Sequence, residues 1–418
     1  MILLRRSALL LLSATIALCA QGPQAGFHLK DGDRVVFFGD SITDQRLYTT
    51  FTETFVVTRF PRFKIAFVHS GWGGDRVTGG GGGPIDARLQ RDVFAHRPTV
   101  MTIMLGMNDG SYRAFDPKIF NTYATGYEYI IRSVKSALPG IRITVIQPSP
   151  FDDVTREPRF EGGYNAVLLR YGQFVKELAQ REGLTVADLN APVVAALEKA
   201  KAADTETAQK IIPDRVHPGP GGHLLMAEAL LKAWNAPATV TSVEIDAANL
   251  GVVRAENAEI TGLQGEGGLS WTQADRALPM PLDPKDTVLA LAVRSSDFVE
   301  ALNQQPLKVT GLTAAAYTLR IDGEAVGNFT SQQLATGVNL ATLPTPMVKQ
   351  AMAVHALTLK HNNIHFTRWR QVQVPLAEDQ LAHKQAALEA LDQLEDDLLE
   401  QQRAAAQPKP RRYELIPD

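Results

Sequence analysis

Short apolar runs alternate with segments of helical period from residue 33 to about residue 236, and this alternation leaves few folds open to the chain. Each short run is apolar on both faces, as in a parallel strand that helices cover on both sides. Apolar residues spaced three and four apart predict helices between the runs. We therefore expect an α/β domain with a five-stranded parallel sheet. The predicted strands are 35–38, 65–68, 100–105, 141–146 and 184–187, and the clearest helices are 117–138, 164–182 and 221–234.

The sequence changes character after Pro237. Residues 238–345 are rich in β-branched residues and glycine, and Asp322-Gly323 between alternating apolar residues predicts a hairpin turn. Residues 346–406 return to helical spacing, and leucines form a rough stripe along the last predicted helix, from about 378 to 406. That stripe fits a helix docked on the body or a short dimer coil. Residues 407–418, with three prolines and a cluster of Lys and Arg, predict a disordered tail.

The first twenty residues have the pattern of a signal peptide. Arg5 and Arg6 precede an apolar run that ends in small residues, and the run is shorter than the roughly 20 residues that span a bilayer. An uncleaved anchor is the alternative. We expect residues 1–20 to be removed and the protein to be secreted or periplasmic. Lipid anchoring at Cys19, the only cysteine, is less favoured because bulky Leu18 precedes it.

The charge balance points away from polyanionic partners. The 418 residues have a formal net charge of −3, which favours neither nucleic acid nor an anionic membrane as a partner. No segment after the signal peptide is apolar enough to predict stable insertion in a membrane. The histidines show no spacing with carboxylates or cysteine that predicts a metal site.

Two polar segments follow the first two predicted strands, where open parallel sheets bind ligands. Gly39-Asp40-Ser41 follows the run 35–38. A serine there lies near a helix N-terminus, where free N–H groups favour negative charge, although Ser is also an ordinary N-cap residue. Ser70-Gly71-Trp72-Gly73-Gly74-Asp75 follows the run 65–68. Its glycines either bring a backbone N–H close to a ligand or only form a turn.

Two further polar segments complete the pattern. Gly106-Met107-Asn108-Asp109 ends the strand 100–105, and the Asn amide either donates to an oxyanion or bonds its own turn. Asp214-Arg215-Val216-His217-Pro218 precedes the last helix of the domain. An Asp three residues before a His lets one loop supply a base and the carboxylate that orients it. The alternative for this pair is two unrelated surface charges.

Together, Gly-Asp-Ser, Gly-Gly-Asp, Gly-x-Asn-Asp and Asp-x-x-His-Pro resemble the four blocks of the SGNH, or GDSL, hydrolase family, over residues 33–234. The resemblance implies a three-layer α/β/α, flavodoxin-like catalytic domain over residues 27–237. It implies Ser41 as the nucleophile, His217 as the base and Asp214 as its orienting carboxylate. The implied oxyanion donors are the Ser41 and Gly74 backbones and the Asn108 side chain. The implied mechanism needs no metal or other cofactor.

The resemblance leaves several substrates open, because the family includes carbohydrate acetylesterases, lipases, lysophospholipases and thioesterases. Expected export, the lack of an evident apolar lid and the added β-rich region favour an acetyl ester on a carbohydrate, either a small molecule or a polysaccharide. Trp72 either lines the acyl pocket or packs in the core. The β-rich region either binds glycan or only packs on the catalytic domain. A lipid esterase, a thioesterase and a catalytically silent binding or scaffold protein are the alternatives.

Overall fold

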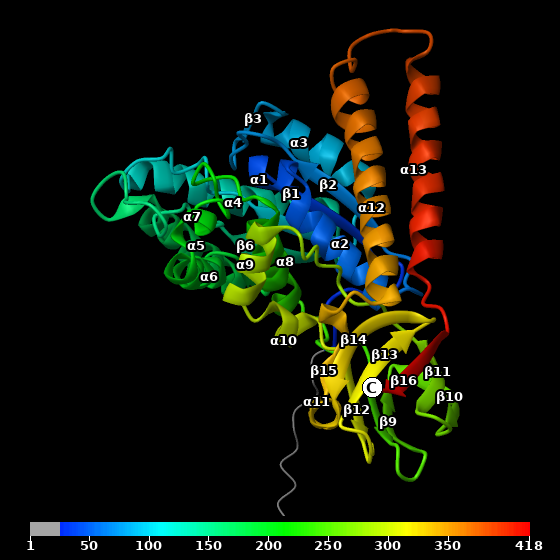
Figure 1. The fold of residues 1–418 in the computed structure, drawn as a ribbon. Helices are drawn as coiled ribbons and strands as arrows, with labels where there is room; N and C mark the ends of the chain where they lie inside the picture. Colours follow the sequence, from blue (N-terminus) through cyan, green and yellow to red (C-terminus); the bar gives the residue numbers. More distant parts are fainter. Residues whose placement is uncertain (1–25) are drawn as a thin grey trace, which may run out of the picture.

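The structure is a computed structural model that describes residues 26–418 (Figure 1). The predicted signal peptide and Cys19 lie outside the described residues. Within residues 26–418, no helix combines the length and the apolar character that crossing a membrane requires.

The α/β domain contains a five-stranded sheet in which every strand runs parallel to its neighbours, as the sequence predicts. The order is β2-β1-β5-β6-β7. The bounds are β1 Arg34–Gly39, β2 Ala66–Gly71, β5 Val100–Met104, β6 Arg142–Gln147 and β7 Thr185–Asp188. The chain changes direction across the sheet between β1 and β5, so the ligand-binding crevice of such folds lies at the carboxyl ends of these two strands.

Helices cover both faces of this sheet (Figure 1). Phe37, Thr102 and Thr144 are neighbours in the sheet and share a face. On that face Tyr48 of α2 packs edge-on against Phe37, and Trp234, directly after α8, donates to Thr144. The helices of the domain are α1 Ser41–Asp44, α2 Leu47–Arg59, α3 Ile85–Asp92, η1 Phe94–His96, α4 Pro117–Ala137, α5 Gly163–Glu182, α6 Ala191–Ala203, α7 Thr205–Ala208 and α8 Pro220–Ala233. A short hairpin of β3 Gly79–Gly80 and β4 Gly83–Pro84 precedes α3.

Helix α2 was not predicted from the sequence, and its composition explains why. The helix is buried almost all round, so it shows no polar stripe. It also contains five threonines, which have low helix propensity. Two of the buried hydroxyls are satisfied within the helix itself: Thr52 donates to the Tyr48 carbonyl at 2.8 Å and Thr58 to the Thr54 carbonyl at 2.7 Å.

The β-rich region has a hydrophobic core of its own, separate from that of the α/β domain. Its two sheets have the orders β10-β11-β16-β13-β14 and β15-β12-β8-β9. The expected hairpin is present, with Asp322 and Gly323 at φ of 52° and 79° between β13 and β14. The bounds are β8 Ser242–Asp246, β9 Gly251–Glu256, β10 Ala258–Gln264, β11 Leu269–Asp275, β12 Pro306–Thr310, β13 Ala316–Ile321, β14 Glu324–Thr330, β15 Val338–Asn339 and β16 Arg411–Pro417.

Part of the predicted β-rich region is helical and belongs to the first core. Helices α9 Thr287–Ser295 and α10 Phe298–Leu302 place Leu289, Leu291 and Phe298 in the core of the α/β domain. Helix α9 packs against α8. Residues 238–345 are therefore divided between the two cores. The short elements α11 Ser331–Thr336 and η2 Leu340–Thr342 complete the region.

The C-terminal helices form a hairpin against the α/β domain, as the docked-helix interpretation expected (Figure 1). They are α12 Pro346–Phe366, a π-helical segment Thr367–Gln373 labelled η3, and α13 Lys384–Ala406. Glu53 of α2 is the polar centre of the contact. Its carboxylate accepts from His361 at 2.6 Å, Gln402 at 2.9 Å and His69 of β2 at 3.2 Å.

The buried contact between Glu53 and His361 is an ion pair. Burial alone would raise the pKa of Glu53, but His361 and His69 outweigh burial and hold that pKa below its usual range. Burial would lower the pKa of His361, but Glu53 and Glu395 raise it to about 9. The pair is therefore ionised at neutral pH. Because both side chains are about 1% exposed, removing one partner would leave a buried unpaired charge, which costs about 3–5 kcal/mol.

The predicted disordered tail is instead strand β16, and this corrects the expectation for residues 407–418. β16 lies between β11 and β13 in its sheet. Tyr413 and Leu415 point inward and are 0% and 1% exposed. Tyr413 stacks on Trp271 of β11 with ring centroids 5.1 Å apart. Both partner strands are far away in sequence, so the local proline and charge content could not reveal the pairing.

We predict that Tyr413→Ala lowers the free energy of unfolding of the β-rich region by about 3–5 kcal/mol, because it removes a fully buried aromatic ring. Urea unfolding followed by tryptophan fluorescence measures the change. Ile416→Ala on the same strand is the control; its side chain is 41% exposed and should cost less than about 1 kcal/mol. Equal effects of the two substitutions would contradict a buried position for Tyr413.

Candidate active site

Ser41 begins helix α1 directly beyond the carboxyl end of β1. The turn needs glycine at residue 39, because an added Cβ would lie 2.2 Å from Thr43 Oγ1 and 2.8 Å from the Met104 carbonyl. Asp40 caps the helix, and its Oδ1 accepts from the Ile42 N–H at 3.0 Å. Complete burial raises the pKa of Asp40 to about 7. The strand, the tight turn and the cap together place the Ser41 side chain at the sheet edge.

Ser41, His217 and Asp214 form one continuous chain of hydrogen bonds. Ser41 Oγ is 2.8 Å from His217 Nε2, and His217 Nδ1 is 2.7 Å from Asp214 Oδ2. The other carboxylate oxygen of Asp214 accepts from the His217 and Val216 N–H groups at 2.7 and 2.9 Å. Burial would raise the pKa of Asp214, but these N–H groups and the imidazole outweigh burial and lower it. An ionised carboxylate thus fixes the imidazole, which can accept the hydroxyl proton.

Hydrogen-bond donors surround the same sheet edge. Gly73 donates its N–H to Asp44 Oδ2 on α1 at 3.1 Å, and Gly74 follows it with φ of 79°. Asn108, beyond the carboxyl end of β5, donates from Nδ2 to the Asp75 carbonyl at 3.1 Å. These contacts bring Gly74 and Asn108 together with α1. Among the described residues, neither the Ser41 nor the Gly74 N–H has an acceptor, and one Asn108 N–H also remains available.

The structure places Trp72 in the packing of the domain. The indole is 8% exposed, and the Arg370 guanidinium lies over its ring at 3.0 Å from the centroid. Trp369 packs edge-on against the same ring at 5.6 Å. These contacts favour the packing alternative for Trp72 over the lining of an acyl pocket.

Arg370 shows that the C-terminal region reaches the site, a contact that the sequence did not predict. Arg370 Nη2 is 4.0 Å from Asp44 Oδ2, and Asp44 also binds the Gly73 N–H. The residue comes from the π-helical segment η3, more than three hundred positions after Ser41. A single arginine among 42 Lys and Arg residues carries no local signal that would identify it.

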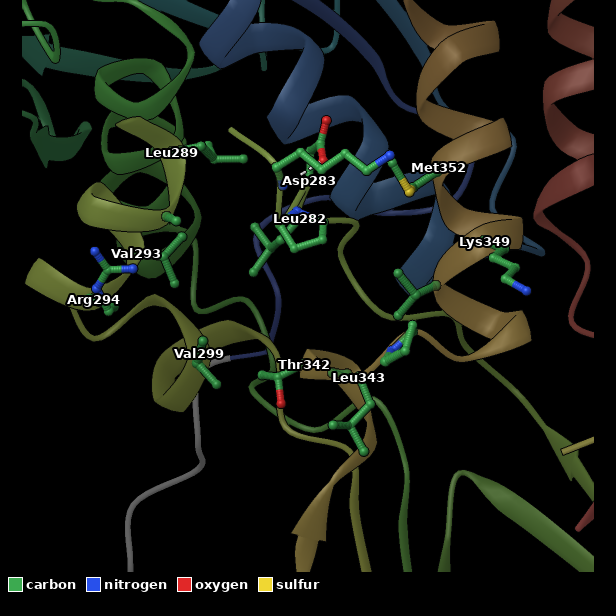
Figure 2. Close-up of a pocket in the computed structure, with 16 residues that line it drawn as sticks. Leu282, Asp283, Leu289, Val293, Arg294, Val299, Thr342, Leu343, Lys349 and Met352 are labelled. Atoms are coloured by element: carbon green, nitrogen blue, oxygen red, sulfur yellow. Dashed lines mark hydrogen bonds between the residues drawn. The ribbon is translucent and has the colours of Figure 1, made fainter. Parts of the chain in front are cut away.

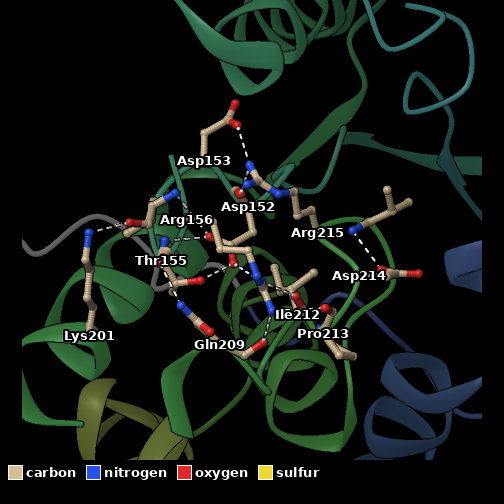
Figure 3. Close-up of polar contacts among 12 residues, drawn as sticks. Asp152, Asp153, Thr155, Arg156, Lys201, Gln209, Ile212, Pro213, Asp214 and Arg215 are labelled. Carbon is tan, nitrogen blue, oxygen red and sulfur yellow. Dashed lines mark hydrogen bonds and ion pairs between the residues drawn. The ribbon is translucent and has the colours of Figure 1, made fainter. Parts of the chain in front are cut away.

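A second loop, residues 152–157, contacts the residues just before Asp214 in the loop that holds Asp214 and His217 (Figure 3). Arg156 donates to the Ile212 carbonyl at 3.1 Å and to the Gln209 and Pro213 carbonyls at 3.0 Å each. It also pairs with the buried carboxylate of Asp152 at 3.0 Å. Arg215 donates to the Glu157 carbonyl at 2.8 Å and has φ of 75°. These contacts satisfy the loop carbonyls and limit movement of the imidazole.

A separate apolar cavity of about 750 Å³ lies where the α/β domain, the β-rich region and α12 meet (Figure 2). Leu282, Leu289, Val293, Leu343 and Met352 are among its lining residues. No member of the Ser41–His217–Asp214 chain lines it. The imidazole and carboxylate of that chain have side chains 37% and 55% exposed, so the candidate site is open to solvent. No group of three or more His, Cys, Asp or Glu is arranged to hold a metal ion within residues 26–418.

The chain is similar to a known family and to several known proteins. Residues 37–225 match the model of the GDSL-like Lipase/Acylhydrolase family. An acetylxylan esterase of Geobacillus stearothermophilus is 26% identical over an alignment of 224 residues, and the match covers 48% of this chain and 93% of the relative. A solved gut microbial diltiazem-metabolizing enzyme is 27% identical, with a TM-score of 0.82 over 95% of this chain and 100% of that one. A solved acetylxylan esterase, Axe2 of Geobacillus stearothermophilus, is 23% identical, with a TM-score of 0.41 over 50% of this chain and 96% of that one.

The class of protein follows from the fold and the family match together: the α/β domain belongs to the GDSL-like lipases and acylhydrolases. The chain is accordingly a carboxylic ester hydrolase. This confirms the family that the four sequence segments suggested. The similarity to the diltiazem-metabolizing enzyme extends beyond that domain, through the β-rich and helical regions.

We predict that Arg156→Ala lowers kcat/KM for an ester substrate by about tenfold to a hundredfold, because the loop carrying His217 loses its brace and small displacements of reacting groups are costly. Initial rates on a chromogenic acetate ester measure the loss. Lys210→Ala is the matched control from the same neighbourhood; its ion pair with Glu206 is exposed, and its activity should match the wild type. Wild-type activity in Arg156→Ala would show that the loop holds its geometry without the brace.

Proposed function

We propose that this protein is a serine esterase that removes acyl groups, chiefly acetyl groups, from a carbohydrate. Ser41 is the nucleophile, His217 the general base and Asp214 the carboxylate that orients it. The observation that carries the proposal is the unbroken contact from Ser41 Oγ to His217 Nε2 at 2.8 Å and from His217 Nδ1 to Asp214 at 2.7 Å. A nucleophile bonded to a base that a third group orients is the arrangement for covalent acyl transfer.

The first half of the reaction forms an acyl-enzyme. Ser41 Oγ attacks the ester carbonyl carbon while its proton passes to His217 Nε2. The carbonyl oxygen becomes an oxyanion, which accepts hydrogen bonds from the Ser41 and Gly74 N–H groups and from the Asn108 amide. The tetrahedral intermediate then breaks its bond to the alcohol oxygen, and His217 returns the proton to that oxygen. The alcohol leaves, and the acyl group remains on Ser41.

The second half releases the acid. Water enters from the open side of the site and gives a proton to His217 as its oxygen attacks the acyl carbonyl. The same donors stabilise the second oxyanion, and its collapse restores the Ser41 hydroxyl with the proton from His217. Asp214 stays ionised throughout, since its lowered pKa favours the carboxylate next to the transient imidazolium.

Acetyl esters of carbohydrates are the substrate class that we favour. The acetylxylan esterase relative supports this choice. The solvent-open site supports it as well, because a bulky sugar chain could approach Ser41 while a small acyl group needs little apolar space. The apolar cavity of about 750 Å³ is lined by no residue of the proposed catalytic set, which weighs against a long-chain lipid substrate there. Secretion or a periplasmic location, proposed from residues 1–20, would bring the enzyme to such a polymer.

For the β-rich region we favour a structural role over glycan binding. An exposed aromatic ring is a large apolar surface with a polar edge, on which a sugar ring can pack. Within residues 26–418, Tyr112 of the α/β domain is the one aromatic residue among the exposed large hydrophobic side chains. Trp271 and Tyr413 stack on each other in the core of the β-rich region, Tyr317 is buried in the same core, and Phe329 is partly buried against it.

We predict that Ser41→Ala abolishes ester hydrolysis and that Asn108→Ala reduces kcat by about a hundredfold to a thousandfold, the usual cost of one oxyanion donor. Hydrolysis of a chromogenic acetate ester and labelling by a fluorophosphonate measure both effects. Wild type and Asn108→Ala should label at Ser41, whereas Ser41→Ala should not. Circular dichroism of each variant confirms folding. Full turnover by folded Ser41→Ala would remove the assignment of the nucleophile.

We predict that acetyl esters are hydrolysed faster than octanoyl esters of the same chromophore, and that acetate is released from acetylated plant polysaccharide. Diltiazem, itself an acetate ester, is a further test substrate because of the similar diltiazem-metabolizing enzyme. Ser41→Ala is the control for spontaneous hydrolysis. An octanoyl optimum without acetate release from polysaccharide would favour a lipid esterase instead.

A further inference from the structure

Tyr112 has an unusual backbone for a residue beside the candidate site. Ser111 and Tyr112 both have positive φ, at 57° and 55°. Two successive residues other than glycine in this left-handed region are uncommon, and such conformations persist only where surrounding contacts hold them. The pair follows the Gly106-Met107-Asn108-Asp109 segment and ends the turn that carries Asn108.

Packing of the ring supplies the contacts that hold this conformation. The Tyr112 ring lies against Tyr164, with centroids 5.0 Å apart, and against Phe151 at 6.3 Å. Tyr164 in turn donates its hydroxyl to the Met107 carbonyl at 2.6 Å. The aromatic group therefore fixes the turn on both sides of Asn108.

The Tyr112 hydroxyl binds the side chain of Asn108, which we propose as a donor to the oxyanion. It donates to Asn108 Oδ1 at 3.0 Å, while Asn108 Nδ2 donates to the Asp75 carbonyl at 3.1 Å. Burial, with the charges of Asp40 and Asp214, raises the pKa of Tyr112 to about 12, so the hydroxyl remains a donor at neutral pH. A flip of the amide would set its oxygen against the Asp75 carbonyl and break both hydrogen bonds, so this pair of contacts favours the orientation with the nitrogen toward Asp75.

The outer part of the same ring is open to solvent. Tyr112 is 40% exposed, and it is the one aromatic among the exposed large hydrophobic side chains of the described residues. An exposed aromatic ring offers an apolar face on which another ring can pack. An exposed ring whose hydroxyl touches Asn108 lies next to where the ester must bind.

We propose that Tyr112 is a positioning residue for the Asn108 amide and that its exposed ring is the binding surface for a ring-bearing alcohol portion of the ester. This inference rests on the proposed function, in which Asn108 is an oxyanion donor. The hydroxyl keeps the amide aligned before the oxyanion forms, which contributes to kcat. The ring contacts the acceptor in the ground state and in the transition state alike, which contributes to KM.

Two substitutions separate these contributions. Tyr112→Phe keeps the ring and its packing and removes only the hydroxyl. We expect kcat to fall about tenfold, which is less than for loss of the whole Asn108 amide, and KM to stay nearly unchanged. Tyr112→Leu removes the ring as well, and KM should rise at least about threefold for an acetylated methyl xyloside but not for ethyl acetate, which has no ring. Acetate release measures each rate. Tyr129→Phe, whose hydroxyl binds Asp86 on the surface, is the matched control and should leave both constants unchanged.

A double variant tests the link to Asn108 directly. If the hydroxyl acts through the amide, Tyr112→Phe should have no further effect in the Asn108→Ala background, because coupled residues are not additive. Additive losses in kcat, or wild-type kcat in folded Tyr112→Phe, would overturn the positioning role. Equal changes in KM for the xyloside and ethyl acetate would overturn the binding surface. If Ser41→Ala is inactive, either of these results overturns only the inference about Tyr112 and leaves the proposed function intact. If Ser41→Ala is active, the proposed function itself is wrong.

Discussion

The parallel arrangement of five strands is the constraint on which the rest of the structure depends. Because every strand runs in the same direction, the carboxyl ends of β1, β2 and β5 open at one edge of the sheet. Ser41, Gly74 and Asn108 follow these three strands, and the loop before α8 adds Asp214 and His217. Residues spread over more than 170 positions therefore meet within hydrogen-bond distance. The strands supply rigidity, and the loops beyond them need only short turns to present polar groups.

The later regions of the chain are joined to this domain by buried polar contacts as well as by apolar packing. Glu53, placed on a helix behind the sheet, receives hydrogen bonds from both helices of the C-terminal hairpin and from His69 of β2. Further along the hairpin, Arg370 covers Trp72 and approaches Asp44, which binds the Gly73 N–H. The hairpin thereby stabilises the two loops that flank Ser41. This gives the C-terminal region a physical role in the site although it contributes no residue to the Ser41–His217–Asp214 chain.

Sequence reasoning succeeded where the signal was local and failed where the partner was distant. Apolar runs with both faces buried predicted the five strands. Polar segments after the strands and before α8 predicted Ser41, Asn108, Asp214 and His217 as site residues, which the structure brings to one end of the sheet. Helix α2 was not predicted because a helix buried all round has no amphipathic period. Strand β16 was not predicted because Tyr413 and Leu415 pair with strands more than ninety positions away. The roles of Tyr112, Arg156 and Arg370 were not predicted for a similar reason. Each role depends on contacts with residues far away or on another loop, and such contacts leave no local pattern.

The sequence by itself determined the alternation of strands and helices, the parallel sheet and the residue types available for acyl chemistry. Those properties depend on hydrophobic period and short motifs, which act over a few residues. Only the tertiary structure decided that the last seven-residue strand completes a sheet, that Trp72 lies under Arg370, and that Tyr112 holds the Asn108 amide. Such contacts depend on how distant segments close-pack, and close packing responds to the shape of the whole core. Local pattern cannot contain that information.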